Sequence, residues 1–507
     1  MRRIVGIWSV GAEVAVVILF FQGTVPWYAS ALLSAALYLL AVNSGLLRPA
    51  WSRWAMGALC GYGGIVAPAM FYAHLPAALD FALALSFEVF LGAWIWSAVR
   101  GRFVRPDDAH VAIGRQGLLG LPVIIPTEDR YLHMHVLGPT GSGKTEGVLW
   151  PLIRKDLARP LGVTVIDPKG DLALRVADTA RSMGRPVTGI GPGLPFTFNP
   201  LAGEAETVAQ GMVEALDRAF PSGNTFFRTL GRTLLRQSIL AVKGVPEADP
   251  GLKDLRDFLA DEDVRREVLL RTRDQGAREY FRKEYASWST KAQREYTIGL
   301  RTELAALADE AEIGRIMGGR EPLDMAGILE RGEVLAVALP IGVLGESGRI
   351  FGSYLLARFQ AAAIGRTRGI PHFLYLDEFQ EFATPAFAEF LELARQYQVG
   401  AVLAHQNLDQ LEPGLRASVL ANARNRILLG GLSGRDLEAL RDSLGRRMGV
   451  RVTEAADGAV KSRTLVEEPR FSPHLVRHLP RGRAVAQVAI RGQIMEPSLV
   501  RLPHPGA

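Results

Sequence analysis

The stretch Gly138-Pro-Thr-Gly-Ser-Gly-Lys-Thr145 decides the fold, because it matches the pattern G-x-x-x-x-G-K-[ST] at every fixed position. The apolar segment Tyr131–Leu137 before it predicts a short strand, and Glu146–Leu157 after it predicts a helix. The glycines let backbone N–H groups turn inwards and bind phosphate oxygens where the helix begins. The residues predicted to bind nucleotide are Gly138, Pro139, Thr140, Gly141, Ser142, Gly143, Lys144 and Thr145.

Two side chains of this loop are expected to carry specific chemistry. Lys144 is predicted to reach the β- and γ-phosphates, and the Thr145 hydroxyl is predicted to bind Mg²⁺. The alternative is a glycine-rich turn that carries Lys-Thr by chance. The strand and the helix on either side favour the phosphate loop, so ATP and Mg²⁺ are the expected cofactors.

An acidic pair supplies the second half of the predicted site. The apolar segment His372–Leu376 reads as a strand that ends in Asp377 and Glu378. Asp377 fits a Mg²⁺-binding role, and Glu378 fits the role of polarising the attacking water. Acidic residues are also common in turns, so the pair gains its weight from the complete phosphate loop that precedes it.

Two further strand ends carry polar residues. Val163–Ile166 is followed by Asp167-Pro-Lys-Gly-Asp171, which is either a plain turn or a nucleotide-sensing one. Ala401–Ala404 is followed by His405, Gln406 and Asn407. A polar side chain there could sense the γ-phosphate, whereas His405 itself is interpreted as structural.

The first hundred residues predict a membrane region. Four apolar runs, at 4–21, 28–47, 54–73 and 77–99, each approach the roughly 20 residues that cross a bilayer. Arginines flank both ends of the region and its middle loop, and the other two loops contain no Lys or Arg. The positive-inside rule therefore places both ends in the cytoplasm. A cleaved signal peptide ending near Ala29-Ser-Ala31 is the alternative for the first run.

Composition adds weak constraints. Cys60 is the single cysteine, which excludes an internal disulfide and a thiolate metal cluster. The net charge of +6 is compatible with an acidic partner.

The cytoplasmic part alternates between two patterns. Strands alternate with helices on both sides of the segment Glu204–Glu312, which predicts a parallel sheet with ligands at the carboxyl ends of its strands. Within that segment, apolar residues recur at helical spacing and predict a helical insertion. The insertion is rich in arginine. Most of these arginines are expected on solvated helix faces, and a few could contact DNA phosphates.

Six motifs together resemble the coupling proteins of conjugation and type IV secretion, the VirD4/TraG/TraD family. They are GPTGSGKTEG at 138–147, DPKGDL at 167–172, FNPL at 198–201, FLYLDEFQEF at 373–382, HQNLDQL at 405–411 and FSPHLVRHLPRGRAV at 471–485. The resemblance implies an α/β fold, in which a RecA-like P-loop NTPase domain carries an inserted all-α domain and assembles as a membrane-anchored ring. This chain differs in having four apolar runs where many members have two.

The resemblance also implies two roles that the pattern alone does not. Gln406 would lie near the γ-phosphate, and Arg395, eleven residues earlier, would be an arginine finger. A solvated arginine at the end of the helix Ala386–Gln396 is the alternative for Arg395. Arg424 and Arg426 are the further candidates for the finger.

The expected protein is an inner-membrane, multi-pass coupling ATPase that recruits a DNA–protein substrate and drives DNA transfer through a type IV secretion channel. The expected partners are single- or double-stranded DNA bound without sequence preference, the relaxosome with its relaxase, the channel proteins, the membrane and further copies of the chain in a hexamer. The alternatives are an FtsK/HerA-like membrane-anchored DNA pump and a nucleotide-regulated membrane scaffold. The expected division is a four-helix membrane region at 1–104, a linker at 105–127, the RecA-like domain at 128–203 and 313–507, and the all-α domain at 204–312.

Overall fold

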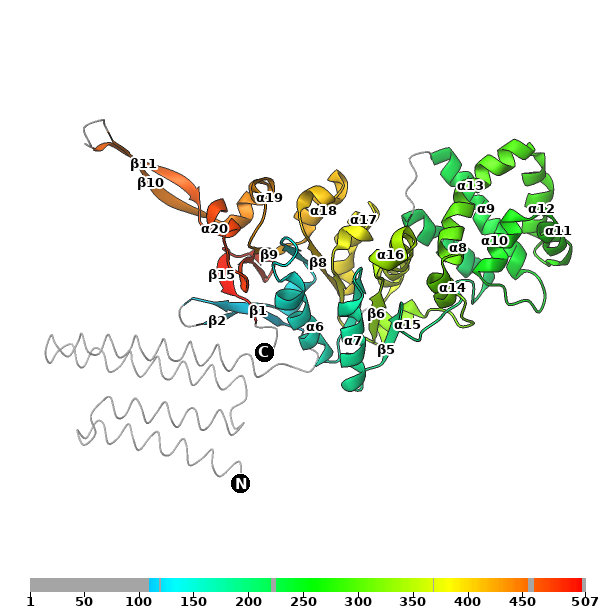
Figure 1. Cartoon of the computed structure of the whole chain (residues 1–507), viewed down its shortest axis with the longest axis horizontal. Helices are drawn as coiled ribbons and strands as arrows, with labels where there is room; N and C mark the ends of the chain where they lie inside the picture. Colours follow the sequence, from blue (N-terminus) through cyan, green and yellow to red (C-terminus); the bar gives the residue numbers. More distant parts are fainter. Residues whose placement is uncertain (1–108, 118–119, 220–224, 368, 455–459, 504–507) are drawn as a thin grey trace, which may run out of the picture. The chain divides into compact units, whose positions relative to one another are not determined.

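The structure, a computed structural model, describes residues 109–117, 120–219, 225–367, 369–454 and 460–503 (Figure 1). They belong to the second of two units into which the chain divides, Pro106–Ala507. The four apolar runs predicted to cross the membrane lie outside the described residues. Within the described ranges, no helix is both long and apolar enough to span a membrane.

An 11-stranded sheet forms the centre of this unit. Seven consecutive strands, β9 to β5 in the order below, pair in parallel, and the remaining four pair antiparallel to their neighbours. From one edge to the other the strands are β2 (Leu121–Ile125), β1 (Val111–Gln116), β15 (Ser498–Arg501), β12 (Arg483–Gln487), β9 (Asn425–Leu429), β3 (Met134–Leu137), β8 (Val399–His405), β7 (His372–Leu376), β4 (Gly162–Asp167), β6 (Val334–Ala338) and β5 (Val187–Ile190).

The parallel strands are mostly apolar because both faces of the sheet are covered by helices. Successive side chains of a strand point to opposite faces, so Leu374 and Leu376 enter one core while Phe373 and Tyr375 enter the other. The first core lies under α16 (Ile341–Gly365), α17 (Phe387–Leu393) and α18 (Pro413–Asn422), and the second lies under α6 (Trp150–Leu157) and α7 (Asp171–Ser182). Figure 1 shows these two groups of helices on opposite sides of the strands.

The segment predicted to be a linker, 105–127, contains two strands of the sheet. β1 pairs antiparallel with β2, and its Arg115 and Gln116 pair with Arg501 and Val500 of β15. The sequence of this segment predicts a connection with short β-like pieces, whereas in the structure these pieces are strands that extend the sheet. β2 is a local partner, but β15 lies almost 400 residues away in the sequence, so no local pattern could predict that the hairpin joins the sheet.

Between β5 and β6 the chain forms a helical region. Its helices are α8 (Ala205–Ala219), α9 (Thr225–Lys243), α10 (Leu252–Ala260), α11 (Glu262–Arg271), α12 (Gln275–Lys283), α13 (Thr290–Ala308) and α14 (Ala311–Met317). Side-chain caps mark where several of them begin: Asp261, Asp274, Ser289 and Glu310 each accept a hydrogen bond from a backbone N–H of the following first turn. Such caps typically contribute about 1 kcal/mol each.

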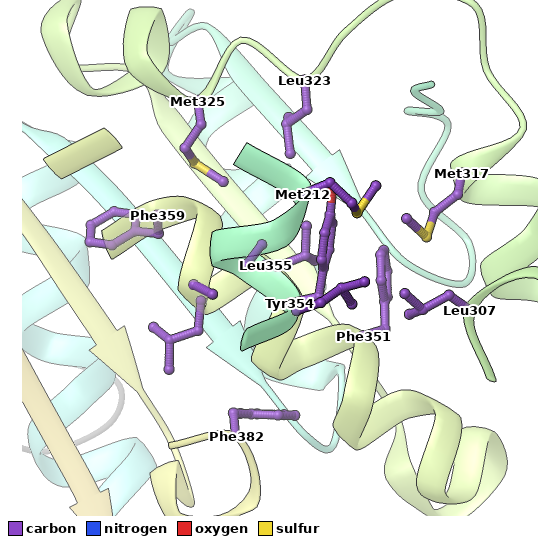
Figure 2. Packing of buried hydrophobic residues seen from close by; sticks show 14 of the residues in the cluster. Met212, Leu307, Met317, Leu323, Met325, Phe351, Tyr354, Leu355, Phe359 and Phe382 are labelled. Carbon is purple, nitrogen blue, oxygen red and sulfur yellow. The ribbon is translucent and has the colours of Figure 1, made fainter. Parts of the chain in front are cut away.

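The helical region shares its core with the sheet layer. Figure 2 shows Met212 of α8, Leu307 of α13 and Met317 of α14 gathered around Phe351 and Tyr354 of α16. All five side chains are buried. The helical region is therefore packed on α16, the helix that follows β6.

The remaining elements are two small separate sheets, short helices and single turns. A hairpin of β10 (Arg446–Glu454) and β11 (Val460–Pro469) forms a separate two-stranded sheet, and β13 (Ala489–Ile490) pairs with β14 (Gln493–Ile494). The short helices are α5 (Thr127–Arg130), α15 (Met325–Glu330), α19 (Gly434–Ala439) and α20 (Pro473–Arg477). Further single turns lie at Tyr285–Ser287, Phe379–Glu381, Ala394–Tyr397, Leu408–Gln410 and Arg441–Leu444, and a π-helical turn, Thr145–Leu149, precedes α6.

Candidate nucleotide-binding site

Strand order brings the predicted motifs to one edge of the sheet. β3, β8, β7 and β4 are neighbours and run parallel, so their carboxyl ends meet there. The phosphate loop follows β3, Gln406 follows β8, Asp377 and Glu378 follow β7, and Asp167 ends β4. β8 lies between the strands that carry the loop and the acidic pair, which places Gln406 between them.

The backbone of the loop has the conformation that a phosphate cradle needs. Gly141 and Gly143 have φ values of +80° and +98°, which favour glycine. A Cβ atom on Gly138 would lie 2.6 Å from the Ser142 Oγ. That Oγ is buried and, among the described residues, has no hydrogen-bond partner. A buried hydroxyl without a partner is costly, and a phosphate oxygen in the cradle would satisfy it.

Lys144 is held at the centre of the site. Its Nζ donates to the carbonyl oxygen of Gly138 at 2.7 Å and lies 3.4 Å from Glu378 Oε1. Both side chains of this ion pair are more than 90% buried, so the attraction between them is weakly screened. The ammonium group therefore lies between the phosphate loop and the acidic pair.

Thr145 and Asp377 are in direct contact. The Thr145 hydroxyl donates to Asp377 Oδ2 at 2.7 Å. Burial and the negative charge of Glu378 raise the pKa of Asp377, and the Thr145 hydrogen bond and Lys144 only partly oppose this. A bound divalent cation would favour the ionised carboxylate. One hydroxyl and one carboxylate, with the remaining ligands taken from phosphate and water, is the donor set that Mg²⁺ prefers.

Glu378 is fixed by its backbone and by two amides. Its φ of +44° and ψ of +52° are left-handed, an uncommon conformation for a residue other than glycine. Gln406 Nε2 donates to Oε1 at 3.3 Å and Gln380 Nε2 donates to Oε2 at 3.1 Å. The carboxylate that was predicted to act as base and the glutamine that was predicted to lie near the γ-phosphate therefore touch each other.

Asp167 has a structural task. Its carboxylate accepts hydrogen bonds from the backbone N–H groups of Lys169, Leu172 and Ala173, at 3.0, 2.7 and 3.3 Å. These contacts cap α7, so the structure supports the turn interpretation of this motif. Burial is the main reason that the pKa of Asp167 is raised.

His405 is buried in the sheet, in agreement with its structural interpretation. Its Nε2 lies 2.6 Å from Nε2 of His135 on β3, and the two rings stack. Burial lowers the pKa of His405 to about 3 and that of His135 well below its ordinary value. Both rings are therefore neutral near pH 7.

The structure places Arg395 away from this edge. The predicted helix Ala386–Gln396 ends earlier, at Leu393, and Arg395 lies in a single turn that precedes β8. His133, just before β3, contacts the carbonyl oxygen of Leu391 at 2.8 Å, so this part of the chain lies where the strands begin. Arg395, the predicted finger for a neighbouring subunit, was also expected to lie beside a strand end that faces nucleotide. That placement was wrong, because the crossover after β7 carries the chain back to the opposite edge of the sheet. The side chain is exposed there.

The two further candidates for the finger also lie at the starting end of a strand. Arg426, on β9, is mostly buried and donates to the Ser443 Oγ at 2.5 Å. Arg424 is exposed and precedes β9.

A buried triad that the sequence did not indicate holds the site together. Asp156, near the end of α6, accepts from Arg130 Nη1 and Nη2 at 2.9 and 2.7 Å and from the Tyr375 hydroxyl at 2.6 Å. Arg130 lies just before β3, and Tyr375 lies two residues before Asp377. The triad therefore links the helix that starts at the phosphate loop to the strand that carries the acidic pair. The sequence held one signal for the triad: Asp156 is a charged residue on the apolar face of the predicted helix Glu146–Leu157.

Comparisons with known proteins agree with this arrangement. Residues 371–481 match the family model described as the TraM recognition site of TraD and TraG. The fold is similar to that of the bacterial conjugative coupling protein TrwBdeltaN70 in its unbound form, with a TM-score of 0.56 and 18% identity over 77% of this chain and 88% of that one. TrwB in complex with ADP and Mg²⁺ is similar at a TM-score of 0.55 and 18% identity, over 80% of this chain and 90% of that one. No curated protein matches the chain.

These matches confirm two predictions: the RecA-like fold with a helical domain, and the resemblance to coupling proteins of the TraG, TraD and VirD4 type.

Proposed function

We infer that this chain is a coupling ATPase of the TraG, TraD and VirD4 type, which hydrolyses ATP with Mg²⁺ and uses the energy to drive DNA transfer in conjugation. One observation carries the proposal: Lys144, Thr145, Asp377, Glu378 and Gln406 converge at the carboxyl ends of three neighbouring strands. A nucleotide-binding scaffold needs the phosphate loop but has no need of a positioned carboxylate and glutamine behind it.

Each residue has a place in the proposed reaction. Mg²⁺, when bound, would neutralise charge on the phosphate oxygens, and Thr145 and Asp377 would hold it. Lys144 moves from Gly138 and Glu378 to the phosphates, which releases the Glu378 carboxylate to accept a proton from the attacking water. Gln406, bonded to the same carboxylate, orients that water. The left-handed backbone at Glu378 limits the positions that its carboxylate can take.

The other expected partners remain part of the proposal. The membrane region at 1–104 anchors the chain in the inner membrane through four helices, and the RecA-like domain at 128–203 and 313–507 and the all-α domain at 204–312 lie in the cytoplasm. The protein works as a hexamer with DNA, the relaxosome and channel proteins. The match of residues 371–481 to a TraM recognition site supports the relaxosome contact. Several arginines of the helical region form exposed ion pairs, including Arg266 with Glu262, so DNA contacts there involve a subset of them.

Hydrolysis by the full chain in detergent tests the proposed chemistry. Wild-type protein should hydrolyse ATP, and single- or double-stranded DNA should stimulate it. Lys144→Ala should weaken nucleotide binding, because it removes the cation that contacts the phosphates. Glu378→Gln is expected to retain binding and to slow hydrolysis by about 10²–10⁴-fold, the usual contribution of a general base. Binding without hydrolysis in the wild type, at any DNA concentration, would instead indicate the nucleotide-regulated scaffold.

A mixing experiment tests the ring and the arginine finger. Arg395 is exposed and distant from its own phosphate loop, so it can act only on the site of a neighbouring subunit. Arg395→Ala protein and Glu378→Gln protein should each be inactive, since a finger contributes about 10³–10⁵ in rate. Mixed rings contain sites with an intact Glu378 and an intact neighbouring Arg395, so activity should return on mixing. Full DNA-stimulated activity of Arg395→Ala alone would show that this residue is a surface arginine.

Reporter fusions test the membrane topology. The charge pattern predicts that a reporter after Arg105 is cytoplasmic and that one at Gly23 is periplasmic. A cytoplasmic signal at Gly23 would contradict the four-helix arrangement and leave the ATPase proposal untouched.

A further inference from the structure

The segment after α20 packs against Gly430 and Gly431, which lie beside the phosphate loop. A Cβ atom on Gly430 would lie 2.1 Å from the carbonyl oxygen of Leu479, and one on Gly431 would lie 2.7 Å from the Pro139 Cγ. Gly431 N–H also donates to the carbonyl oxygen of Arg477 at 2.9 Å. Gly430 and Gly431 therefore lie between residues 477–479 on one side and Pro139 of the phosphate loop on the other.

A hydrogen-bonded turn completes this segment. Arg483 N–H donates to the carbonyl oxygen of Pro480 at 3.1 Å, and Leu502 N–H donates to that of Gly482 at 2.9 Å. Gly482 has a φ of +84°, so the turn depends on glycine at this position. Leu502 in turn packs beside the loop helix, 3.3 Å from where a Cβ on Gly147 would lie. The backbone at residue 481 is therefore held in place from both sides.

Arg481 is the residue that this turn presents to the phosphate loop. A Cβ atom on Gly143 would lie 3.8 Å from both Cγ and Nε of Arg481. The guanidinium group is exposed, and within the described ranges it makes no hydrogen bond, ion pair or ring contact. Other arginines near the site differ: Arg130 is bonded to Asp156, and Arg175 is bonded to Glu146. A cation held without a carboxylate partner beside a cradle for phosphate is placed to bind an anion.

We propose that Arg481 is a nucleotide-binding residue, which contacts the phosphate chain of the nucleotide bound in the same subunit. This inference rests on the proposed function, because the ligand is the nucleotide of the phosphate loop. Lys144 approaches from the side of the acidic pair and Arg481 from the side of Gly143, so the two cations flank the loop. The motif at 471–485, which the ATPase chemistry leaves without a task, would then support the phosphate loop and supply this arginine.

Nucleotide affinity of the full chain tests the proposal, with a fluorescent ADP derivative as the probe so that turnover does not interfere. Arg481→Ala should weaken binding by about 10- to 100-fold, the usual effect of losing one charge-assisted contact. Arg481→Lys should restore part of the loss because it keeps the charge. Arg483→Ala, an exposed arginine two residues later, is the matched control and should bind as the wild type does. Equal thermal melting of all variants would show that the fold is intact.

The outcomes separate the two proposals. If the wild type binds and hydrolyses nucleotide while Arg481→Ala binds within about twofold of it, Arg481 is not a ligand and the ATPase proposal stands. If the wild type binds no nucleotide, both are overturned.

A mixture distinguishes contact within a subunit from contact across an interface. Arg481→Ala protein should not recover full affinity when it is mixed with Lys144→Ala protein. Each variant subunit lacks one residue of its own nucleotide site, and the neighbouring subunit cannot supply it. Recovery on mixing would mean that Arg481 serves the neighbouring subunit, which would overturn the assignment to the same subunit.

Discussion

Replacing Asp156 with alanine should destabilise the nucleotide-binding unit without touching the nucleotide. The Asp156 side chain is fully buried and accepts three hydrogen bonds, two from Arg130 and one from Tyr375. The Arg130 side chain is only 3% exposed, and its guanidinium carbon lies 3.3 Å from the centre of the Phe373 ring. Alanine at position 156 leaves this cation buried without its counter-charge.

The expected loss follows from that burial. Removing one partner of a buried ion pair typically costs about 3–5 kcal/mol. Unfolding entropy is about 2.1 cal/mol/K per residue, so a unit of about 400 residues has an unfolding entropy of roughly 0.8 kcal/mol/K. The melting temperature should therefore fall by about 4–6 °C.

Differential scanning fluorimetry of the full chain in detergent measures this shift. Asp178→Ala is the control, because it removes an exposed ion pair with Arg181 on α7 and should change the melting temperature by less than about 1 °C. The double variant Arg130→Met, Asp156→Leu should recover much of the loss, since it removes the unpaired charge. A melting temperature of Asp156→Ala within about 1 °C of the wild type would refute the argument that this triad stabilises the unit.

Two further predictions concern buried groups. The free energy of unfolding should fall as the pH falls below about 6.5, because four buried histidines stay neutral in the folded protein while the unfolded chain protonates them. Burial lowers the pKa of His133 to about 4, those of His372 and His405 to about 3, and that of His135 well below its ordinary value. At pH 5.5 each histidine should cost about 1.4 kcal/mol, or roughly 5–6 kcal/mol together. Urea titrations at pH 7.5 and 5.5 measure the difference, and equal stability at the two values would contradict it. Gly162→Ala should destabilise the sheet by about 1–3 kcal/mol or more, because its Cβ would lie 2.0 Å from Nδ1 of the buried His372. Gly211→Ala, on a helix with open space around it, should be neutral or slightly stabilising in the same urea titration, and equal effects of the two variants would rule out the steric explanation.

The sequence alone was sufficient for features that depend on short stretches of chain. The phosphate loop needs glycine at positions with positive φ, a preceding apolar strand and a following helix, and all three lie within residues 131–157. The helices of the insertion were predictable for the same reason, because apolar spacing and capping residues act within a few turns. The roles of Asp377 in Mg²⁺ binding and of Glu378 in polarising water could be predicted only in combination with the phosphate loop.

Features that depend on which strands are neighbours could not be predicted in this way. The segment expected to be a linker forms the hairpin of β1 and β2, which joins the sheet because β1 also pairs with the distant β15. Arg395 was expected near a nucleotide-facing strand end, but the crossover between β7 and β8 returns it to the opposite edge. Both errors concern where a segment lies relative to the sheet.

The sequence alone therefore predicted which residues form the site, and only the tertiary structure determined how they are arranged. Local patterns identified the strand ends that carry Lys144, Glu378 and Gln406. Only the packing of strands and helices determined that β8 lies between β3 and β7, so that Gln406 and Lys144 both reach Glu378. The Asp156 triad arises in the same way, since its three residues come from segments that are separated by up to 245 positions. The pairing of such distant segments is stabilised by the burial of whole layers of helices and strands. That burial cannot be predicted from any single stretch of sequence.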